Sequence, residues 1–580
     1  MTQKNISGCC SFIWQWIKQL YADNVVELKE LLWFVALMIQ NHFSDLRCST
    51  SDDLVENCLT SLVKIPPTLL NFSPFIIVLA FSGHLGKMDL DAMTLCSSFI
   101  TITGISIGQG LTTACDTLVS QIYGGKNLKL IGVIIQRAIL ILFLACFPCW
   151  ALFVNTKSIL LLLGQDPKVA SLAERCVMVQ IPSLPVIFYC QLQQRYLQNQ
   201  GIIWPQTIIC FIGNILLIIL CYVFLFIVKT GVIGASVALT ITYTSELILL
   251  FLFIHLKKLH VDTWPGWSFI CLADWNSFLS LGIPSMLMLY TEWWIYDIAI
   301  FLAGHINLVE LGAQAVLLEL GIFLHEISYS VAMACSIKLG NYLGAGETDK
   351  AKKVAQLSFL VTAFTTLFLI SILLGLRTPI VSLLTNDKEI LSLVIKATPI
   401  IAIFFVADAM CALFGGIIRG TGKQTVGAIV YALGFLLINF SISIPLMFVV
   451  KIGTRGFWIG VTAGIFFIDI FFLIYYWRIN WQDLTKQAQE RAGLTKNSEK
   501  EPISFHYSGH DTSDNLELKN YAALESSNSE TQLDRQVSQP SKKKIDQPLK
   551  KIIIRRVLDT IAVVSVFIIG LIIRFTVKHP

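Results

Sequence analysis

The sequence predicts an all-α polytopic membrane protein. Two parallel six-helix lobes form a 12-helix core, and a thirteenth transmembrane helix follows at the C-terminal end. The first observation is composition: the 580 residues are 55% hydrophobic and 14% charged, and the mean hydropathy is +0.69, values typical of membrane proteins. The second is a series of apolar runs of about 20 residues or more, long enough to cross a bilayer. The third is a repeat of motifs between the two halves.

The chain begins with a cytoplasmic lead and an atypical polar insertion, which together occupy residues 1–63. The first apolar run, 65–81, follows directly and carries Pro66 and Pro67 at its start. Proline fits the first turn of a helix but removes a hydrogen bond from its interior. We therefore expect a shortened first transmembrane helix that begins near Pro66.

Two blocks of further apolar runs define the lobes. The first lobe is expected over 64–254 and the second over 275–478, with a basic cytoplasmic linker, 255–274, between them. Besides the first helix, we expect membrane spans at 92–115, 131–154, 173–197, 203–228 and 232–254 in the first lobe, and at 276–303, 311–337, 354–376, 390–418, 424–450 and 454–477 in the second.

The C-terminal part of the chain consists of a hydrophilic segment followed by an apolar one. Residues 479–556 are hydrophilic and rich in Ser, Gln, Lys and Asp, which predicts a disordered cytoplasmic tail. Residues 557–580 carry one more apolar run and are expected to form the thirteenth transmembrane helix. Lysine and arginine are more frequent in alternate loops and in the tail, so those loops and the N-terminus are assigned to the cytoplasmic side.

The repeat indicates how the two lobes are related. Gly124 corresponds to Gly344, and the Ala-Cys pair at 114–115 also occurs at 334–335, an offset of about 220 residues. An even number of spans in each half gives both halves the same orientation, so the repeat is parallel. Two such lobes with a site between or within them are the usual architecture of alternating-access transporters.

Composition also excludes several classes of protein. The net charge of +5 is small for this length and does not indicate nucleic-acid binding. The 15 cysteines are scattered through the chain, the one CxxC pair (Cys146 and Cys149) lies inside an apolar run, and no His–Cys spacing for zinc is present, so no metal site is expected. No Walker-type nucleotide motif is present, which disfavours ATP as the driving force. We expect a transporter without a cofactor, not an enzyme.

The stretch 289–326 carries carboxylates inside two apolar runs: Glu292, Asp297, Glu319 and Glu326. An ionised carboxylate at the centre of a bilayer costs about 3 kcal/mol on insertion scales, so such residues are usually functional. The cluster predicts a buried site that holds a cation or a proton. The structural alternative is a set of carboxylates that are only hydrogen-bonded inside a bundle.

Aromatic residues surround Glu292 and could form the wall of a cation site through cation–π contacts. Tyr296 is four residues from Glu292 and therefore lies on the same helical face, which makes it the preferred wall residue. Trp293 and Trp294 are further candidates. They point about 100° apart, so at least one of them is expected to pack or to lie at the membrane interface.

Several long motifs of this chain resemble the vertebrate branch of the multidrug and toxin extrusion (MATE) family. The resemblance covers about 64–481 together with the tail and the thirteenth helix. Its most specific motifs are SGHLGKMDLDAMTL (82–95), GLTTACDTLVSQIYGGKN (110–127), PSMLMLYTEWW (284–294), LGNYLGAGETDKA (339–351) and GGIIRGTGKQTVGAIV (415–430).

The resemblance implies an antiporter that exports small organic cations, drugs and toxins in exchange for protons. It places the substrate- and proton-binding site at Glu292, Asp297, Glu319 and Asp408. It also implies a multi-pass protein of the plasma membrane, surrounded by lipid and active as a monomeric transport unit. The proton is the expected coupling ion, with Na⁺ as the alternative because carboxylates also bind it.

This chain departs from the family pattern in ways that leave its substrate range open. Asp297 and Asp408 stand where the branch usually has glutamate, and Leu318 and His325 stand where it usually has tyrosine. The polar insertion also interrupts a first helix that is normally continuous. A lipid flippase of similar architecture and a transport-impaired membrane protein are therefore the alternative functions.

Two residues are secondary site candidates. Glu326 is an acid without an expected family counterpart, and His325 would titrate near neutral pH if it were solvated. A neutral histidine packed inside the bundle is the interpretation that we favour for His325 from sequence.

Overall fold

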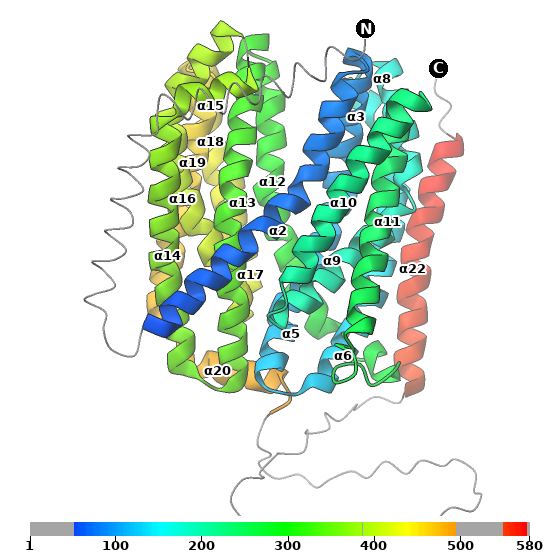
Figure 1. The fold of residues 1–580 in the computed structure, drawn as a ribbon, viewed down its shortest axis with the longest axis vertical. Helices are drawn as coiled ribbons and strands as arrows, with labels where there is room; N and C mark the ends of the chain where they lie inside the picture. The colour runs from blue at the N-terminus through cyan, green and yellow to red at the C-terminus, as the bar shows by residue number, and fades with distance from the viewer. Residues whose placement is uncertain (1–50, 386, 495–548, 577–580) are drawn as a thin grey trace, which may run out of the picture. The chain divides into compact units, whose positions relative to one another are not determined.

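The computed structural model describes residues 51–385, 387–494 and 549–576. In these residues, 12 single helices are long and apolar enough to cross a membrane, and a bent pair of helices brings the number to 13. Ser61–Pro580 form one compact unit. The helices of this unit form two bundles, α3 to α11 and α12 to α19 (Figure 1). The all-α fold with a two-lobe core is thus confirmed.

The first lobe follows the sequence expectation closely in the number of its spans. Its helices are α2 (Ser51–Gly83), α3 (Lys87–Ile100), α4 (Ser106–Thr112), α5 (Ala114–Gly124), α6 (Leu128–Phe153), α7 (Thr156–Leu162), α8 (Pro167–Gln180), α9 (Ser183–Asn199), α10 (Trp204–Tyr222) and α11 (Val232–Leu256). Wider π-helical turns at Thr101–Ile105 and Val223–Ile227 continue α3 into α4 and extend α10.

The second lobe has longer helices. They are α12 (Trp275–Gly304), α13 (Leu308–Ala345), α14 (Thr348–Gly375), α15 (Arg377–Leu384), α16 (Lys388–Thr421), α17 (Gln424–Tyr431), α18 (Asn439–Ile444) and α19 (Thr454–Arg478). Helix α20 (Trp481–Arg491) and helix α22 (Leu549–Thr576) follow the second lobe.

The first candidate membrane span begins at Pro66, as expected, but the helix that carries it begins earlier. Helix α2 starts at Ser51, although its apolar part begins at Pro66 as the sequence indicated. The prolines therefore lie inside the helix, which transmembrane helices tolerate where other groups bind the freed carbonyls. Pro74 has no N–H for the carbonyl of Leu70, and this oxygen instead accepts hydrogen bonds from Ser73 Oγ at 2.8 Å and Asn214 Nδ2 at 3.0 Å.

The span expected at 173–197 is a broken one. Helices α8 and α9 meet at an angle of 55°. Pro182 lies at this junction, where it can donate no backbone hydrogen bond. The bend turns α9 toward the second lobe, and Arg195 of this helix approaches Met333 and Tyr329 of α13.

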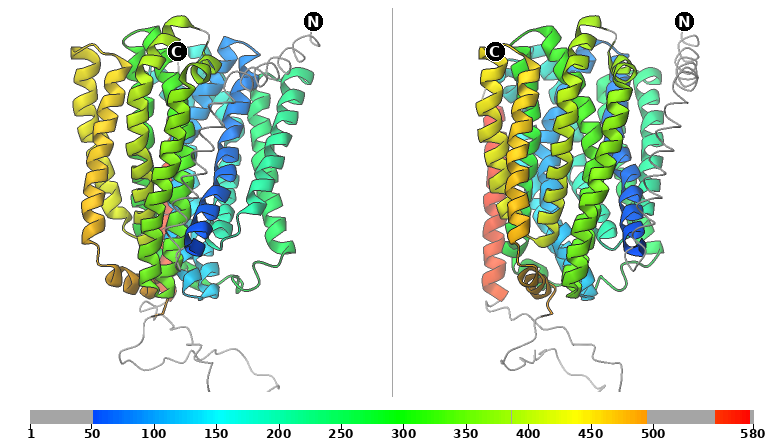
Figure 2. Two further views of the ribbon diagram at one scale, coloured as in Figure 1. Left: turned by 60° about the vertical axis from the view of Figure 1, so that its left-hand side comes forward. Right: turned by 90° about the vertical axis from the view of Figure 1, so that its left-hand side faces the viewer.

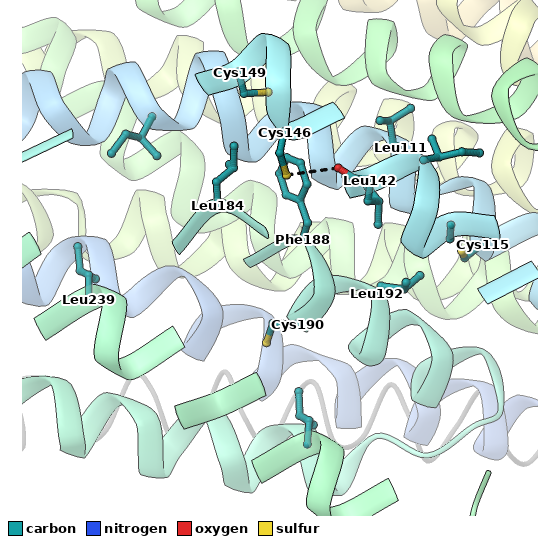
Figure 3. Close-up of a cluster of buried hydrophobic side chains, with 14 of the residues drawn as sticks. Leu111, Cys115, Leu142, Cys146, Cys149, Leu184, Phe188, Cys190, Leu192 and Leu239 are labelled. Atoms are coloured by element: carbon teal, nitrogen blue, oxygen red, sulfur yellow. Dashed lines mark hydrogen bonds between the residues drawn. The ribbon is translucent and has the colours of Figure 1, made fainter. Parts of the chain in front are cut away.

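Each lobe has its own apolar core. The core of the first lobe is built largely from leucine, isoleucine and cysteine side chains, and Figure 3 shows Cys146 and Phe188 at its centre. The boundary between the cores falls inside α12: Leu281 belongs to the first core and Met288 to the second. The second lobe predicted to start at 275 therefore begins with turns that pack on the first lobe.

Helix α20 corrects the prediction of a disordered tail from residue 479. It lies across one end of the bundle in all three views (Figures 1 and 2). Thr485 contacts Thr348 at 2.8 Å between the hydroxyl oxygens, and Arg491 donates to Gln121 Oε1 at 3.3 Å. The helix forms because Leu484 and Ala488 are buried in the core of the second lobe, and it also contacts α5 of the first lobe. The rest of the predicted tail, 495–548, lies outside the described residues.

Helix α22 lies at the edge of the first lobe (Figure 1), where it packs on α6. Asn155 Nδ2 donates to the carbonyl of Gly570 at 2.8 Å, and the Arg574 guanidinium lies 3.0 Å from the Glu174 carboxylate. Arg556 stacks 4.1 Å above the ring of Trp275. Polar contacts at both ends thus hold the thirteenth helix in register.

The two lobes approach each other most closely where α5 crosses α13. Gly124 lies against the carbonyl of Asn341, and Gly344 lies against the carbonyl of Gln121, so that a Cβ atom at either glycine would overlap the opposing backbone. Each pair is the counterpart of the other in the sequence repeat. Gln121 Nε2 also donates to the carbonyl of Gly420 on α16 at 3.0 Å. We call these contacts the α5–α13 closure.

Candidate functional site

A cavity of about 520 Å³ lies between the two lobes. Its first-lobe wall comes from α2, α3, α4, α9 and α11, and its second-lobe wall comes mainly from α12 and α13. This volume is in the range of small-molecule sites. The cavity-lining residues include these candidates from the sequence: Glu292, Trp293, Trp294, Tyr296, Asp297, Glu319, His325 and Glu326.

Helical periodicity explains why these residues share one wall. On α13 the lining residues Leu318, Ile322, His325 and Tyr329 recur every three or four positions, which places them in one stripe. Glu319 and Glu326 are seven residues apart and form the adjacent stripe. Apolar residues on the other sides of α13 are buried in the second core, so these two stripes are turned toward the cavity.

Asp408 is the one predicted carboxylate that does not line the cavity. It is 2% exposed and lies on α16 behind His325. The Nδ1 atom of His325 lies 3.0 Å from Oδ2 and 3.2 Å from Oδ1 of Asp408. The Nε2 atom of the same ring lies 3.8 Å from Oε1 of Glu292. We call Glu292, His325 and Asp408 the carboxylate–histidine triad.

This geometry differs from the packed histidine expected from sequence. Because an ionised carboxylate can only accept a hydrogen bond, Nδ1 of His325 donates to Asp408. Nε2 then faces Glu292, where it can hold or release a second proton. Glu292 is 9% exposed. The triad therefore places three titratable groups at the boundary between the cavity and the second core.

The remaining carboxylates face the cavity more freely. Asp297 is exposed, and Glu319 and Glu326 are partly exposed. Among the residues that the structure describes, none of the three makes a hydrogen bond or an ion pair through its carboxylate. They can therefore bind a cation in the cavity without first breaking an internal contact.

The aromatic candidates occupy the same wall. Tyr296 lines the cavity beside Glu292, and its ring centroid lies 6.1 Å from that of Trp458, which also lines the cavity. Trp293 and Trp294 both contribute to the wall. Trp294 is also 46% exposed and packs edge-on against Tyr290, with ring centroids 5.3 Å apart. The wall thus combines aromatic faces with negative charge, which suits an organic cation.

The chain is similar in sequence to a family of known proteins. The MatE family model matches residues 68–223 and 284–444. Multidrug and toxin extrusion protein 1 of Mus musculus is 41% identical over 92% of this chain and 96% of its own length. Multidrug and toxin extrusion protein 2 of the same species is 45% identical over 74% of this chain and 75% of its own length. The chain belongs to the MATE family.

A solved MATE structure supports the same assignment. The crystal structure of the eukaryotic MATE transporter AtDTX14 superposes with a TM-score of 0.73 at 27% identity, and covers 76% of this chain and 99% of that protein. MATE proteins are membrane transporters. The chemistry of the cavity is therefore the chemistry of binding and release, not of a reaction.

The structure adds cavity residues of this MATE protein that the sequence pattern did not single out. Lys64 and Arg195 contribute positively charged groups to the first-lobe wall. The same wall includes Glu246, which, like Glu326, is an acid without an expected family counterpart. Gln191, Gln194 and Gln198 of α9 contribute an amide stripe. The three- and four-residue spacing of these glutamines inside an apolar span was a signal that could have identified the stripe. Phe404 and Trp458 complete the second-lobe wall.

Proposed function

We propose that this chain is a plasma-membrane antiporter that exports small organic cations, including drugs and toxins, in exchange for protons by alternating access. The observation that carries the proposal is the carboxylate–histidine triad at the wall of a cavity between two lobes. The printed names of its relatives, multidrug and toxin extrusion proteins, agree with such cargo. The proposal includes a monomeric transport unit in lipid, and the lining of the cavity by both lobes of one chain supports it.

Substrate binding in this proposal uses charge and aromatic surface together. Glu292, Asp297 and Glu319 provide the negative charge, and Tyr296 and Trp293 provide polarisable faces. A cation–π contact contributes about 0.5–2 kcal/mol, depending on desolvation. Negative charge spread over several positions of a wide cavity fits cations of varied shape.

Coupling follows from competition for the same negative charge. A proton that binds the triad removes the charge that holds the substrate, and loss of that proton restores it. One pH unit corresponds to about 1.4 kcal/mol per proton, enough to drive a monovalent cation to a tenfold gradient. A histidine between the two carboxylates favours the proton over Na⁺ as the coupling ion, because Na⁺ binds oxygen ligands whereas imidazole binds protons readily.

Alternating access requires that one end of the cavity close while the other opens. The α5–α13 closure lies at the end that carries α20. The distribution of positive charge assigns this end to the cytoplasm. We therefore propose that the lobes part at the closure to load substrate from the cytoplasm, and that α20 follows this movement. The acidic second-lobe wall disfavours an anionic lipid headgroup as cargo.

The test is uptake of tetraethylammonium by cells that express the full chain, driven by an outward proton gradient. Wild-type protein is compared with Glu292→Gln and with Glu490→Gln, a change of the same kind at an exposed site on α20. We expect gradient-dependent uptake that only Glu292→Gln abolishes. Uptake that requires external Na⁺ would instead support sodium coupling. No uptake despite normal surface expression would support the transport-impaired alternative.

A further inference from the structure

The first turns of α22 carry a cluster of basic side chains. Lys550, Lys551 and Arg555 are exposed, and no carboxylate pairs with any of them in the described part of the chain. We call these three residues the basic cluster. Lys551 and Arg555 are one turn apart and lie on the same face of the helix, where Leu558 follows and is 60% exposed. The basic cluster therefore stands at the end of an apolar surface of α22 that is turned toward lipid.

The apolar run that follows fixes the depth of the basic cluster in the membrane. Residues 557–575 span about 28 Å at 1.5 Å per residue, close to the ~30 Å thickness of the hydrocarbon core. The cluster directly precedes this run, which places its charges at the level of the phospholipid headgroups. In Figure 1 this end of α22 lies at the same end of the molecule as α20, the end that the distribution of positive charge assigns to the cytoplasm.

The linker between the lobes exposes large apolar side chains next to this end of α22. Trp267, Phe269 and Ile270 are 66%, 68% and 50% exposed, and we call them the interfacial loop. Gln136 of α6 holds the backbone on both sides of Trp267, since its amide donates to the preceding carbonyl at 2.7 Å and accepts from the following N–H at 3.0 Å. The exposed indole therefore sits on a fixed backbone. Tryptophan in such a position is typical of the membrane–water interface.

Arg556 joins the interfacial loop to α22. Its Nε atom donates to the carbonyl of Leu272 at 2.8 Å, and the short helical turn Phe269–Leu272 contacts α22. Because Arg556 directly precedes the apolar run, this bond holds the loop at the depth of the headgroups. Arg556 is itself paired, with its Nη1 atom 2.7 Å from Asp559 Oδ2. The positive charge without a protein partner at this place is therefore that of the basic cluster.

We propose that the basic cluster and the interfacial loop form a binding site for an anionic phospholipid of the cytoplasmic leaflet. The phosphate groups of the lipid accept hydrogen bonds from the basic cluster, and the interfacial loop enters the membrane beside the acyl chains. Two observations select this occupant. The charge of the cluster is complementary to the negative cytoplasmic leaflet, and the cluster continues the lipid-facing surface of α22. The site lies outside the cavity and goes beyond the proposed function, because it gives the thirteenth helix a ligand of its own.

Lipid binding to the purified full-length protein in a neutral detergent tests the site independently of transport. Microscale thermophoresis compares dioctanoyl phosphatidylinositol bisphosphate with dioctanoyl phosphatidylcholine, which has no net charge. We expect the wild-type protein to bind only the anionic lipid. Glutamine at all three positions of the basic cluster should weaken this binding by about 10- to 100-fold. A variant that keeps the charges, with Lys550→Arg, Lys551→Arg and Arg555→Lys, should retain most of the affinity.

A matched control removes the same amount of charge from other parts of the cytoplasmic end. It carries glutamine at three exposed lysines of the α5–α6 loop, α14 and α20, namely Lys126, Lys352 and Lys486. We expect its affinity for the anionic lipid to equal that of the wild type. The acyl chains are tested by a variant with Trp267→Ser and Phe269→Ser, and by inositol trisphosphate, which is a headgroup without chains. The wild-type protein should bind the lipid more tightly than the headgroup, and the serine variant should lose this difference.

Three results would overturn the lipid site. Equal binding of both lipids by the wild-type protein, or no binding of either, would show that no anionic headgroup is recognised. Equal weakening by the cluster variant and by the lysine control would show that only the overall charge of the cytoplasmic end matters, as in the orientation of membrane spans. Equal affinity of the wild-type protein for the lipid and for inositol trisphosphate would show a site for soluble phosphates. None of these results depends on whether tetraethylammonium is transported.

Discussion

The Nδ1 atom of His325 lies 3.0 Å from Oδ2 of Asp408, so the imidazole, which lines the cavity, contacts a carboxylate that does not. Asp408 is covered, whereas Glu292 on the other side of the imidazole lines the cavity. The His325 ring therefore lies between the buried carboxylate of Asp408 and the carboxylate of Glu292 at the cavity. A tyrosine at this position could donate a hydrogen bond but could not carry the proton as a cation at neutral pH.

Replacing the histidine tests its part in coupling. In His325→Gln the amide can still donate a hydrogen bond to Asp408 but cannot take up a proton. We expect tetraethylammonium uptake to continue, with its stimulation by a proton gradient reduced to about half or less. The measurement is uptake at several imposed pH gradients, with His305→Gln at the exposed end of α12 as the control. Unchanged gradient dependence would remove His325 from the coupling site.

Filling the α5–α13 closure should favour the state in which the lobes are apart. In Gly344→Ala the added Cβ overlaps the carbonyl of Gln121. Such overpacking costs about 1–3 kcal/mol, which shifts a two-state equilibrium by roughly 5- to 150-fold. We expect slower transport and faster hydrogen–deuterium exchange over 339–351. Gly375→Ala, where nothing lies within 4 Å of the added carbon, is the control, and equal behaviour of the two variants would contradict the closure.

The Glu310 carboxylate ties the start of α13 to the start of α19. Its Oε2 atom accepts hydrogen bonds from the Thr454 backbone N–H at 2.8 Å and from the Thr454 hydroxyl at 2.7 Å. Glu310→Ala should destabilise the protein by about 1–2 kcal/mol, since it leaves a helix N-terminus uncapped. Thermal unfolding followed by tryptophan fluorescence measures the loss. A midpoint equal to that of Glu490→Ala, which lies on the exposed face of α20, would be the contrary result.

Arg491 holds α20 against both lobes. Its Nη1 atom donates to Gln121 Oε1 on α5 and to the carbonyl of Thr421 on α16, each at 3.3 Å. Arg491→Ala should weaken this attachment by about 1–2 kcal/mol and increase hydrogen–deuterium exchange over 481–491. Lys486→Ala changes an exposed residue of the same helix and serves as the control. Equal exchange in the two variants would show that α20 is held by its apolar face alone.

Much of the architecture could be predicted because it is encoded locally. A run of about 20 apolar residues is a membrane span whatever surrounds it, and the repeat of Gly124 as Gly344 indicated two equivalent lobes. The cost of a carboxylate in such a run pointed to Glu292 as a candidate, and the structure places this residue at the cavity. The prolines suggested a helix that starts near Pro66, whereas α2 starts at Ser51 and contains them. Inside the helix, hydrogen bonds from Ser73 and Asn214 satisfy the Leu70 carbonyl that Pro74 leaves without a backbone donor.

The sequence by itself determined the number of spans, the two-lobe plan and the acidic wall, because hydropathy and charge are properties of single segments. Only the tertiary structure decided that His325 joins Glu292 to Asp408, that Lys64 faces them from the other lobe, and that α20 packs on both. Such relationships depend on how each helix is rotated and tilted against partners hundreds of residues away. That orientation is set by side-chain packing across the whole bundle.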